Sequence, residues 1–127
     1  MEHPVPAAER GAIRIAERVV AKVAAQAARE ALRSHREGPP LPPGVGGPHA
    51  SVVVRRPPGD DGSGGQAHIR VAVELGYPSD IGGQCAAVRH QVVRRVAEMV
   101  GMEASHVAVE VDRLHSAQSQ GEPGRVR

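Results

Sequence analysis

The sequence predicts an α+β fold: a small, mostly antiparallel sheet with two helices on one face, in the order β-α-β-β-α-β. Three observations lead to this fold. A long stretch without Gly or Pro has apolar residues at helical spacing, later stretches are β-branched or alternate apolar and polar residues, and a second helical stretch lies between two of those strands. With 127 residues the chain is long enough for one hydrophobic core. We therefore expect a single domain over residues 11–114.

The first half is predicted to hold a short strand, a helix and a linker. Residues 1–10 contain two prolines and little pattern, and we expect a disordered lead-in. Residues 11–15 alternate apolar and polar side chains, which predicts a very short strand. From Ala16 to about Ser34 one apolar stripe recurs at i, i+3, i+4 and i+7, which predicts a helix. The Pro/Gly-rich residues 38–48 end that helix and are expected to form a linker.

The second half is predicted to hold two paired strands, a helix and a last strand. Residues 51–56 are rich in β-branched side chains, and residues 68–75 alternate strictly, which predicts an antiparallel hairpin around a Gly-rich turn. Ser79 or Asp80 can cap a helix that runs to about Val100, with Gly101 as its stop signal. Its apolar side is predicted to consist of Ile81, Cys85, Val88, Val92, Val96 and Met99. Residues 107–112 alternate again, and residues 115–127 are expected to be a disordered tail.

Composition narrows the function classes. The chain has no Phe or Trp and one Tyr, whereas single-stranded nucleic-acid binders and many cofactor pockets rely on aromatic rings. The 16 Lys and Arg residues nearly balance the 14 Asp and Glu residues, so the chain is not polybasic. A single cysteine, Cys85, excludes an internal disulfide and a multi-cysteine zinc site, and suits a reducing cytoplasm. No stretch approaches the ~20 apolar residues of a membrane span.

Isolated reactive residues are predicted to be structural. His68 and His106 could meet across the sheet, but solvent-facing strand positions explain them more simply. Cys85 lies on an apolar helix side and should behave as a small hydrophobe rather than as an activated nucleophile. Asp60-Asp61 lacks the spaced carboxylates of a calcium loop, and the following Gly-rich residues 62–65 lack the lysine of a phosphate loop. We expect no catalytic residue, no metal and no cofactor.

One basic cluster is the candidate partner-binding face. It consists of Arg89, His90, Arg94 and Arg95. These residues lie away from the predicted apolar stripe of the second helix, so the outer face of that helix should be basic. An ordinary solvated face is one interpretation. The other is a surface for an acidic protein tail, anionic lipid head groups or nucleic acid.

Four stretches of the second half share a pattern with a known family. They are residues 69–81, residues 88–96, Met99-Val100-Gly101-Met102, and Val107-Ala108-Val109-Glu110-Val111. These stretches resemble the alkaline shock protein family, the envelope stress-response proteins of Gram-positive bacteria, and the resemblance implies an actinobacterial member. Residues 11–16, followed by Val19-Val20, resemble the amino-terminal motif of that family. The turn here has Gly76-Tyr77-Pro78 where the family has Tyr-Gly, and the Gly-Val that usually follows the first helix has only a loose counterpart in Gly44-Val45.

The resemblance implies a non-enzymatic protein in the cytoplasm, associated with the membrane through an integral membrane partner and able to self-associate. On this basis we expect a protein-interaction module or scaffold that serves the envelope stress response. The alternative is a small RNA-binding module that uses the basic second helix. The Gly-x-x-Gly signature of KH domains is missing between the two helices, and the low net charge also disfavours RNA.

Overall fold

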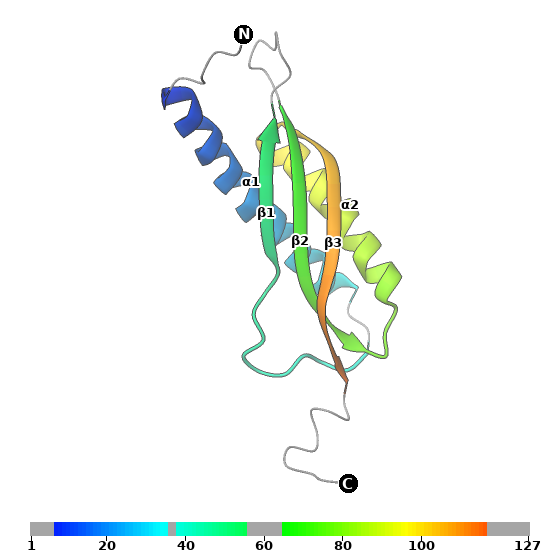
Figure 1. The fold of residues 1–127 in the computed structure, drawn as a ribbon. Helices are drawn as coiled ribbons and strands as arrows, with labels where there is room; N and C mark the ends of the chain where they lie inside the picture. Colours follow the sequence, from blue (N-terminus) through cyan, green and yellow to red (C-terminus); the bar gives the residue numbers. More distant parts are fainter. Residues whose placement is uncertain (1–6, 36–37, 56–64, 117–127) are drawn as a thin grey trace.

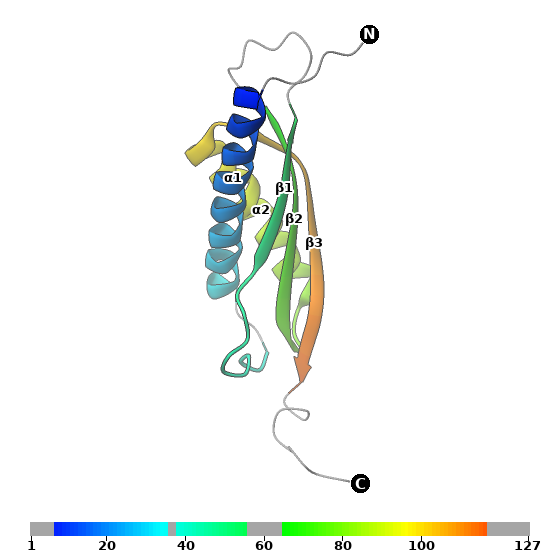
Figure 2. The ribbon, with the colours of Figure 1, turned by 60° about the vertical axis from the view of Figure 1, so that its left-hand side comes forward.

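The computed structural model describes residues 7–35, 38–55 and 65–116. These residues form two helices and three strands in the order α-β-β-α-β. The elements are α1 (Ala7–Ser34), β1 (His49–Arg55), β2 (Gln66–Tyr77), α2 (Ile81–Val100) and β3 (Glu103–Ser116). Both helices lie on the same side of the sheet (Figures 1 and 2). The α+β class and the one-sided helical layer are therefore confirmed.

The sheet has the strand order β1-β2-β3, and it is mixed. β1 pairs antiparallel with β2, with Val53 opposite His68, as the predicted hairpin requires. β2 pairs parallel with β3, with Ile69 beside Val107. The parallel pair arises because α2 crosses over the sheet between the two strands and returns the chain in the same direction. The expectation of a mostly antiparallel sheet was wrong on this point.

The predicted first strand is also wrong, because residues 11–15 belong to α1. That helix begins at Ala7, inside the predicted lead-in, whose residues 1–6 lie outside the described part of the chain. Ile13, Ala16 and Val20 are spaced by three and four residues, and the first two pack against the core that Val20 joins. Over five residues the alternation is compatible with either structure, so the helical spacing that continues into α1 decides the outcome.

The domain also ends later than expected. β3 runs from Glu103 to Ser116, so the first two residues of the predicted tail belong to a strand. The rest of that tail and nearly all of the predicted Gly-rich turn lie outside the described residues.

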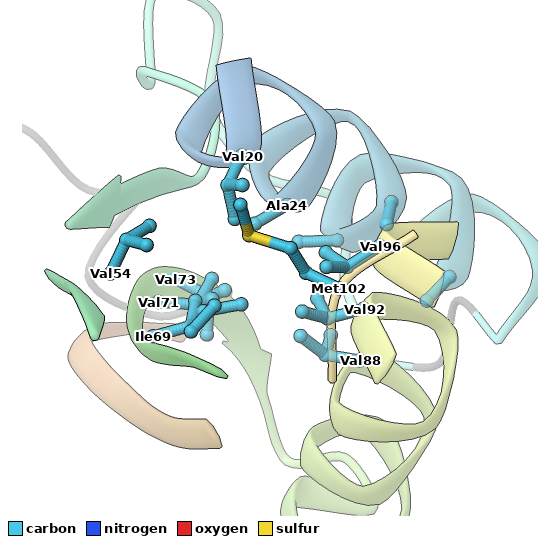
Figure 3. Close-up of a cluster of buried hydrophobic side chains, with 14 of the residues drawn as sticks. Val20, Ala24, Val54, Ile69, Val71, Val73, Val88, Val92, Val96 and Met102 are labelled. Carbon is cyan, nitrogen blue, oxygen red and sulfur yellow. The ribbon is translucent and has the colours of Figure 1, made fainter. Parts of the chain in front are cut away.

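The core is aliphatic and lies between β2 and the two helices (Figure 3). β2 alternates buried and more exposed residues, as predicted, and its core side consists of Ala67, Ile69, Val71, Val73 and Leu75. α2 contributes Val88, Val92 and Val96, all fully buried, whereas Met99 of the predicted stripe is 60% exposed. Met102, just beyond the helix, is buried in the core instead.

The second half of α1 is buried through alanines. In this half its buried side consists of Ala24, Ala27, Ala28 and Ala31, whereas the buried side of α2 consists mainly of valines. Small side chains allow the two helices to approach closely, and this explains how a core without Phe or Trp is filled.

The ends of α2 follow the predicted signals. The Asp80 carboxylate accepts a hydrogen bond from the backbone N–H of Gly83 at 2.9 Å. Gly101 adopts φ 73°, the left-handed conformation that favours glycine, and its N–H donates to the Ala97 carbonyl at 3.1 Å. Neither helix in the described ranges is long and apolar enough to cross a membrane.

Candidate functional site

In the basic cluster, His90 and Arg94 lie on the outer side of α2, opposite its buried valines, whereas Arg89 and Arg95 lie on the two flanks of that buried side. Arg89, His90 and Arg94 are exposed, whereas Arg95 is only partly exposed. Their position on the surface agrees with the helical spacing of the sequence. Their contacts, however, divide them into three groups with different roles.

Arg95 is held between the two helices. Its Nε lies 3.5 Å from Glu30 Oε1 on α1, and its Nη1 lies 3.6 Å from Glu98 Oε1 on α2. Gln91 Nε2 donates to the same Glu30 oxygen at 3.1 Å. The Gln91 hydrogen bond, helped by the charge of Arg95, lowers the pKa of Glu30. Arg95 therefore serves the packing of α1 on α2, and the basic face is narrower than expected.

Arg94 and His90 border the groove between the helices. Arg94 Nε lies 3.7 Å from Glu98 Oε2, one turn further along α2. His90 and Arg94 line this groove together with Glu30 of α1 and His35, the residue that follows α1. The groove carries both signs of charge, so it does not present the uniform positive field that nucleic acid attracts.

Arg89 reaches the sheet rather than solvent alone. Its Nε donates to the backbone carbonyl of Val107 at 3.3 Å. Val107 belongs to β3, which lies at one edge of the sheet. Burial raises the pKa of the neighbouring Cys85 thiol, and the positive charge of Arg89 offsets only part of this rise. The thiol packs against the core, as predicted for a small hydrophobe.

The structure brings the two strand histidines together. His68 and His106 are neighbours in the β2–β3 register, and their ring centroids lie 6.0 Å apart. Their side of the sheet is the one that the helices leave open. Within residues 7–35, 38–55 and 65–116, no group of three His, Cys, Asp or Glu side chains could hold a metal ion. The pair Asp60-Asp61 and Gly62 to Gly64 lie outside those ranges.

Sequence reasoning missed a packed site at residues 38–48. A Cβ added to Gly38 would collide with the Pro78 carbonyl oxygen, and one added to Gly76 would collide with the Pro39 carbonyl oxygen. The two glycines therefore allow the segment to pack directly on the turn between β2 and α2. The Pro/Gly-rich composition of residues 38–48 predicts a linker, but glycines in two distant segments also allow their backbones to approach closely.

One buried polar side chain lies beside this contact. Gln84, on the first turn of α2, is only 4% exposed. Its Nε2 donates to Ser79 Oγ at 2.9 Å and to the Asp80 carbonyl at 3.0 Å, which ties the helix start to the turn. Gln84 was not singled out from sequence, because nothing in a helical pattern distinguishes a buried glutamine from an exposed one.

The chain matches no family model, no curated protein and no solved structure.

Proposed function

We propose that this chain is a non-enzymatic interaction module or scaffold of the envelope stress response. In this proposal it works in the cytoplasm, docks on a membrane-anchored protein partner and associates with copies of itself. The resemblance to the alkaline shock protein family supplies the cellular setting. The single structural observation that carries the proposal is the edge strand β3.

β3 has the properties of a surface that accepts another strand. It is 14 residues long and lies at the edge of the three-stranded sheet, and no segment in the described ranges pairs with its outer side. Val107, Val109 and Val111 on its core side are only partly buried. An added strand would satisfy backbone groups along this edge and cover more of these valines.

The basic residues of α2 support a secondary role. Arg94 and Arg95 already face Glu98 and Glu30, so their charge is partly compensated within the chain. Such a face would steer an acidic partner during encounter more than it would hold the complex together. The same compensation disfavours the RNA-binding alternative.

The edge hypothesis can be tested at a bulge in β3. Val73 pairs with Val111 and Glu74 with Arg113, so Asp112 is an extra residue without a β2 partner. Bulges are among the few sheet positions that accept proline, which removes an N–H and obstructs an added strand. Asp112→Pro should therefore lose self-association in sedimentation velocity and lose membrane localisation of a tagged protein, while Asp112→Ala keeps both.

Circular dichroism must show that the proline variant is folded. If folded Asp112→Pro associates and localises like the wild type, the β3 edge is not the contact surface. If the wild type stays monomeric and diffuse in the cell, and a pull-down from membranes recovers no partner, the proposed function itself is wrong. Binding to RNA that falls steeply with added salt would favour the alternative.

A further inference from the structure

A cavity of about 280 Å³ lies beneath residues 38–48. It opens where the last turns of α1, the end of β2 and the start of α2 meet, at the end of the molecule where the segment loops around (Figure 2). Its apolar wall is formed by Leu32 of α1, Leu75 of β2, and Leu41 and Val45 of the segment itself. The close backbone approaches of Gly38 to Pro78 and of Gly76 to Pro39 place the segment directly over the end of β2 and the turn that follows it.

Two arginines and one carboxylate supply the charge at this cavity. Arg29 donates to Gln26 at 2.9 Å, and its guanidinium lies against the backbone of Gly47. Arg33 lies within ion-pair distance of no carboxylate in the described ranges, although its charge helps to lower the pKa of Glu30. Glu74 is already engaged, since His115 Nε2 lies 2.6 Å from its Oε1. Positive charge therefore exceeds negative charge, and the two guanidinium groups are open to an anion.

Gln84 adds a directional polar group. It lines the cavity, and both N–H groups of its amide are used within the chain. Among the described residues nothing donates to its Oε1. A buried acceptor without a donor is costly, so a ligand N–H or a water that donates to this oxygen would be favoured.

We infer that this cavity binds a short apolar carboxylate: an aliphatic group of a few carbons packed on the leucine and valine wall, with its carboxylate on Arg29 and Arg33. The volume is near the roughly 300 Å³ lower limit of drug-sized ligand pockets, which restricts the ligand to a small acid or to one terminal residue of a peptide. The two sources share the aliphatic carboxylate. They differ in the N–H next to it, which only an acylated amino acid can donate to Gln84.

Three probes separate these features. N-acetyl-leucine carries the aliphatic group, the carboxylate and the N–H. N-acetyl-leucine amide lacks only the charge, and 4-methylpentanoate keeps the aliphatic group and the carboxylate but lacks the N–H. Binding would be followed by NMR shifts of the backbone amides of Leu32, Gly46 and Leu75 in the purified chain, so the test does not depend on any partner.

The carboxylates should give saturable shifts, and the amide should bind at least about tenfold more weakly, because charge-assisted hydrogen bonds to guanidinium are lost. Tighter binding of N-acetyl-leucine than of 4-methylpentanoate identifies a peptide terminus as the natural source, and the reverse order identifies a free acid. Arg29→Gln and Arg33→Gln should each weaken binding by a similar factor. Both side chains belong to exposed residues, so the variants should fold.

Arg18→Gln is the matched control, because Arg18 is an exposed arginine of the same helix outside the cavity. It should bind like the wild type. Equal affinity for the acid and its amide overturns the inference. So does undiminished binding by both Arg29→Gln and Arg33→Gln, or the absence of saturable shifts in the wild type.

Discussion

The two edges of the sheet are protected in opposite ways and to different extents. β1 has 7 residues, and the backbone N–H of Val54 donates to Glu17 Oε2 of α1 at 3.0 Å. β3 has 14 residues, and the carbonyl of Val107 accepts from Arg89 Nε of α2 at 3.3 Å. The negatively charged Glu17 of α1 thus accepts from an N–H of β1, and the positively charged Arg89 of α2 donates to a carbonyl of β3.

The difference in length decides how much of each edge stays available. β1 is short, so after one side-chain contact few of its backbone groups stay available to another strand. It also follows a proline, Pro48. One side-chain contact on β3 leaves most of the outer edge of that strand unpaired, although the register shifts at Ser105 and Asp112 interrupt the regular strand. β1 is therefore a closed edge and β3 an open one.

The difference between the two edges would be lost if α2, which packs under β3, were displaced. Val92→Asp should do this, because the Val92 side chain is fully buried and a carboxylate there has no described partner. Leaving a charge buried and unpaired costs about 3–5 kcal/mol, which is a large part of the stability of a small domain. Thermal unfolding followed by circular dichroism should show loss of the cooperative transition.

Arg94→Asp on the exposed side of the same helix is the control. It removes one exposed ion pair to Glu98, so its effect should stay within about 1 kcal/mol. Equal melting temperatures for the Val92 and Arg94 variants would show that the buried stripe of α2 is assigned to the wrong side.

The sequence predicts the elements around β2 well because their signals are local. The alternation of residues 68–75, the cap at Asp80 and the stop at Gly101 each act within one turn or one strand, and all three are found in the structure. The strand at residues 11–15 was wrong because five residues give too short a pattern to separate two periods. The parallel direction of β3 follows from the α2 crossover and could have been inferred.

The candidate site was harder to predict because it depends on contacts between distant segments. The spacing places Arg89, Arg94 and Arg95 away from the buried stripe of α2, but only the packing of α1 shows that Glu30 takes up Arg95. The cavity under residues 38–48 depends on the close approach of Gly38 to Pro78 and of Gly76 to Pro39, which are far apart in the sequence. The periodicity of apolar residues along the sequence does not predict contacts between such distant segments.

Glu17→Ala would test whether the closed edge needs its cap. The substitution leaves the Val54 N–H without its partly buried acceptor, which should cost about 1–3 kcal/mol in urea unfolding. Glu17→Gln keeps a side-chain oxygen in place and should lose less. Exchange of the Val54 amide should become faster in Glu17→Ala. Arg18→Ala, at the exposed neighbouring position, should change stability by no more than about 0.5 kcal/mol.

The bridge from Glu30 of α1 to Arg95 and Gln91 of α2 should make stability depend on pH. The pKa of Glu30 is lowered below the ordinary value of 4.5, first by the Gln91 hydrogen bond and also by the charge of Arg95. A carboxylate with a lowered folded pKa stabilises the fold above its unfolded pKa and loses that contribution as pH falls through the folded pKa. The stability difference between wild type and Glu30→Gln should therefore be constant above 4.5 and shrink below it.

Urea unfolding from about pH 6 to about pH 3 would measure this effect. Gln91→Ala removes the largest cause of the lowered pKa, so its stability should fall less steeply with acid than that of the wild type. A difference between wild type and Glu30→Gln that stays constant over the whole range would mean that the bridge does not stabilise the charged carboxylate.

Arg89→Ala should have the smallest effect on stability and the most informative effect on association. The hydrogen bond to Val107 is long and exposed, so its loss should change the free energy of unfolding by no more than about 1 kcal/mol. The substitution also removes the hydrogen bond by which a charged side chain of α2 contacts the β3 backbone. If Arg89 protects the open edge, its removal should increase self-association at a given protein concentration, because one more backbone carbonyl becomes available to an added strand.

Arg94→Ala removes a comparable charge without a contact to β3 and should leave self-association unchanged. Sedimentation velocity on the two folded variants decides between these outcomes. Equal association of both variants and the wild type would mean that Arg89 does not guard the edge, and weaker association of Arg89→Ala alone would make the guanidinium part of the contact itself.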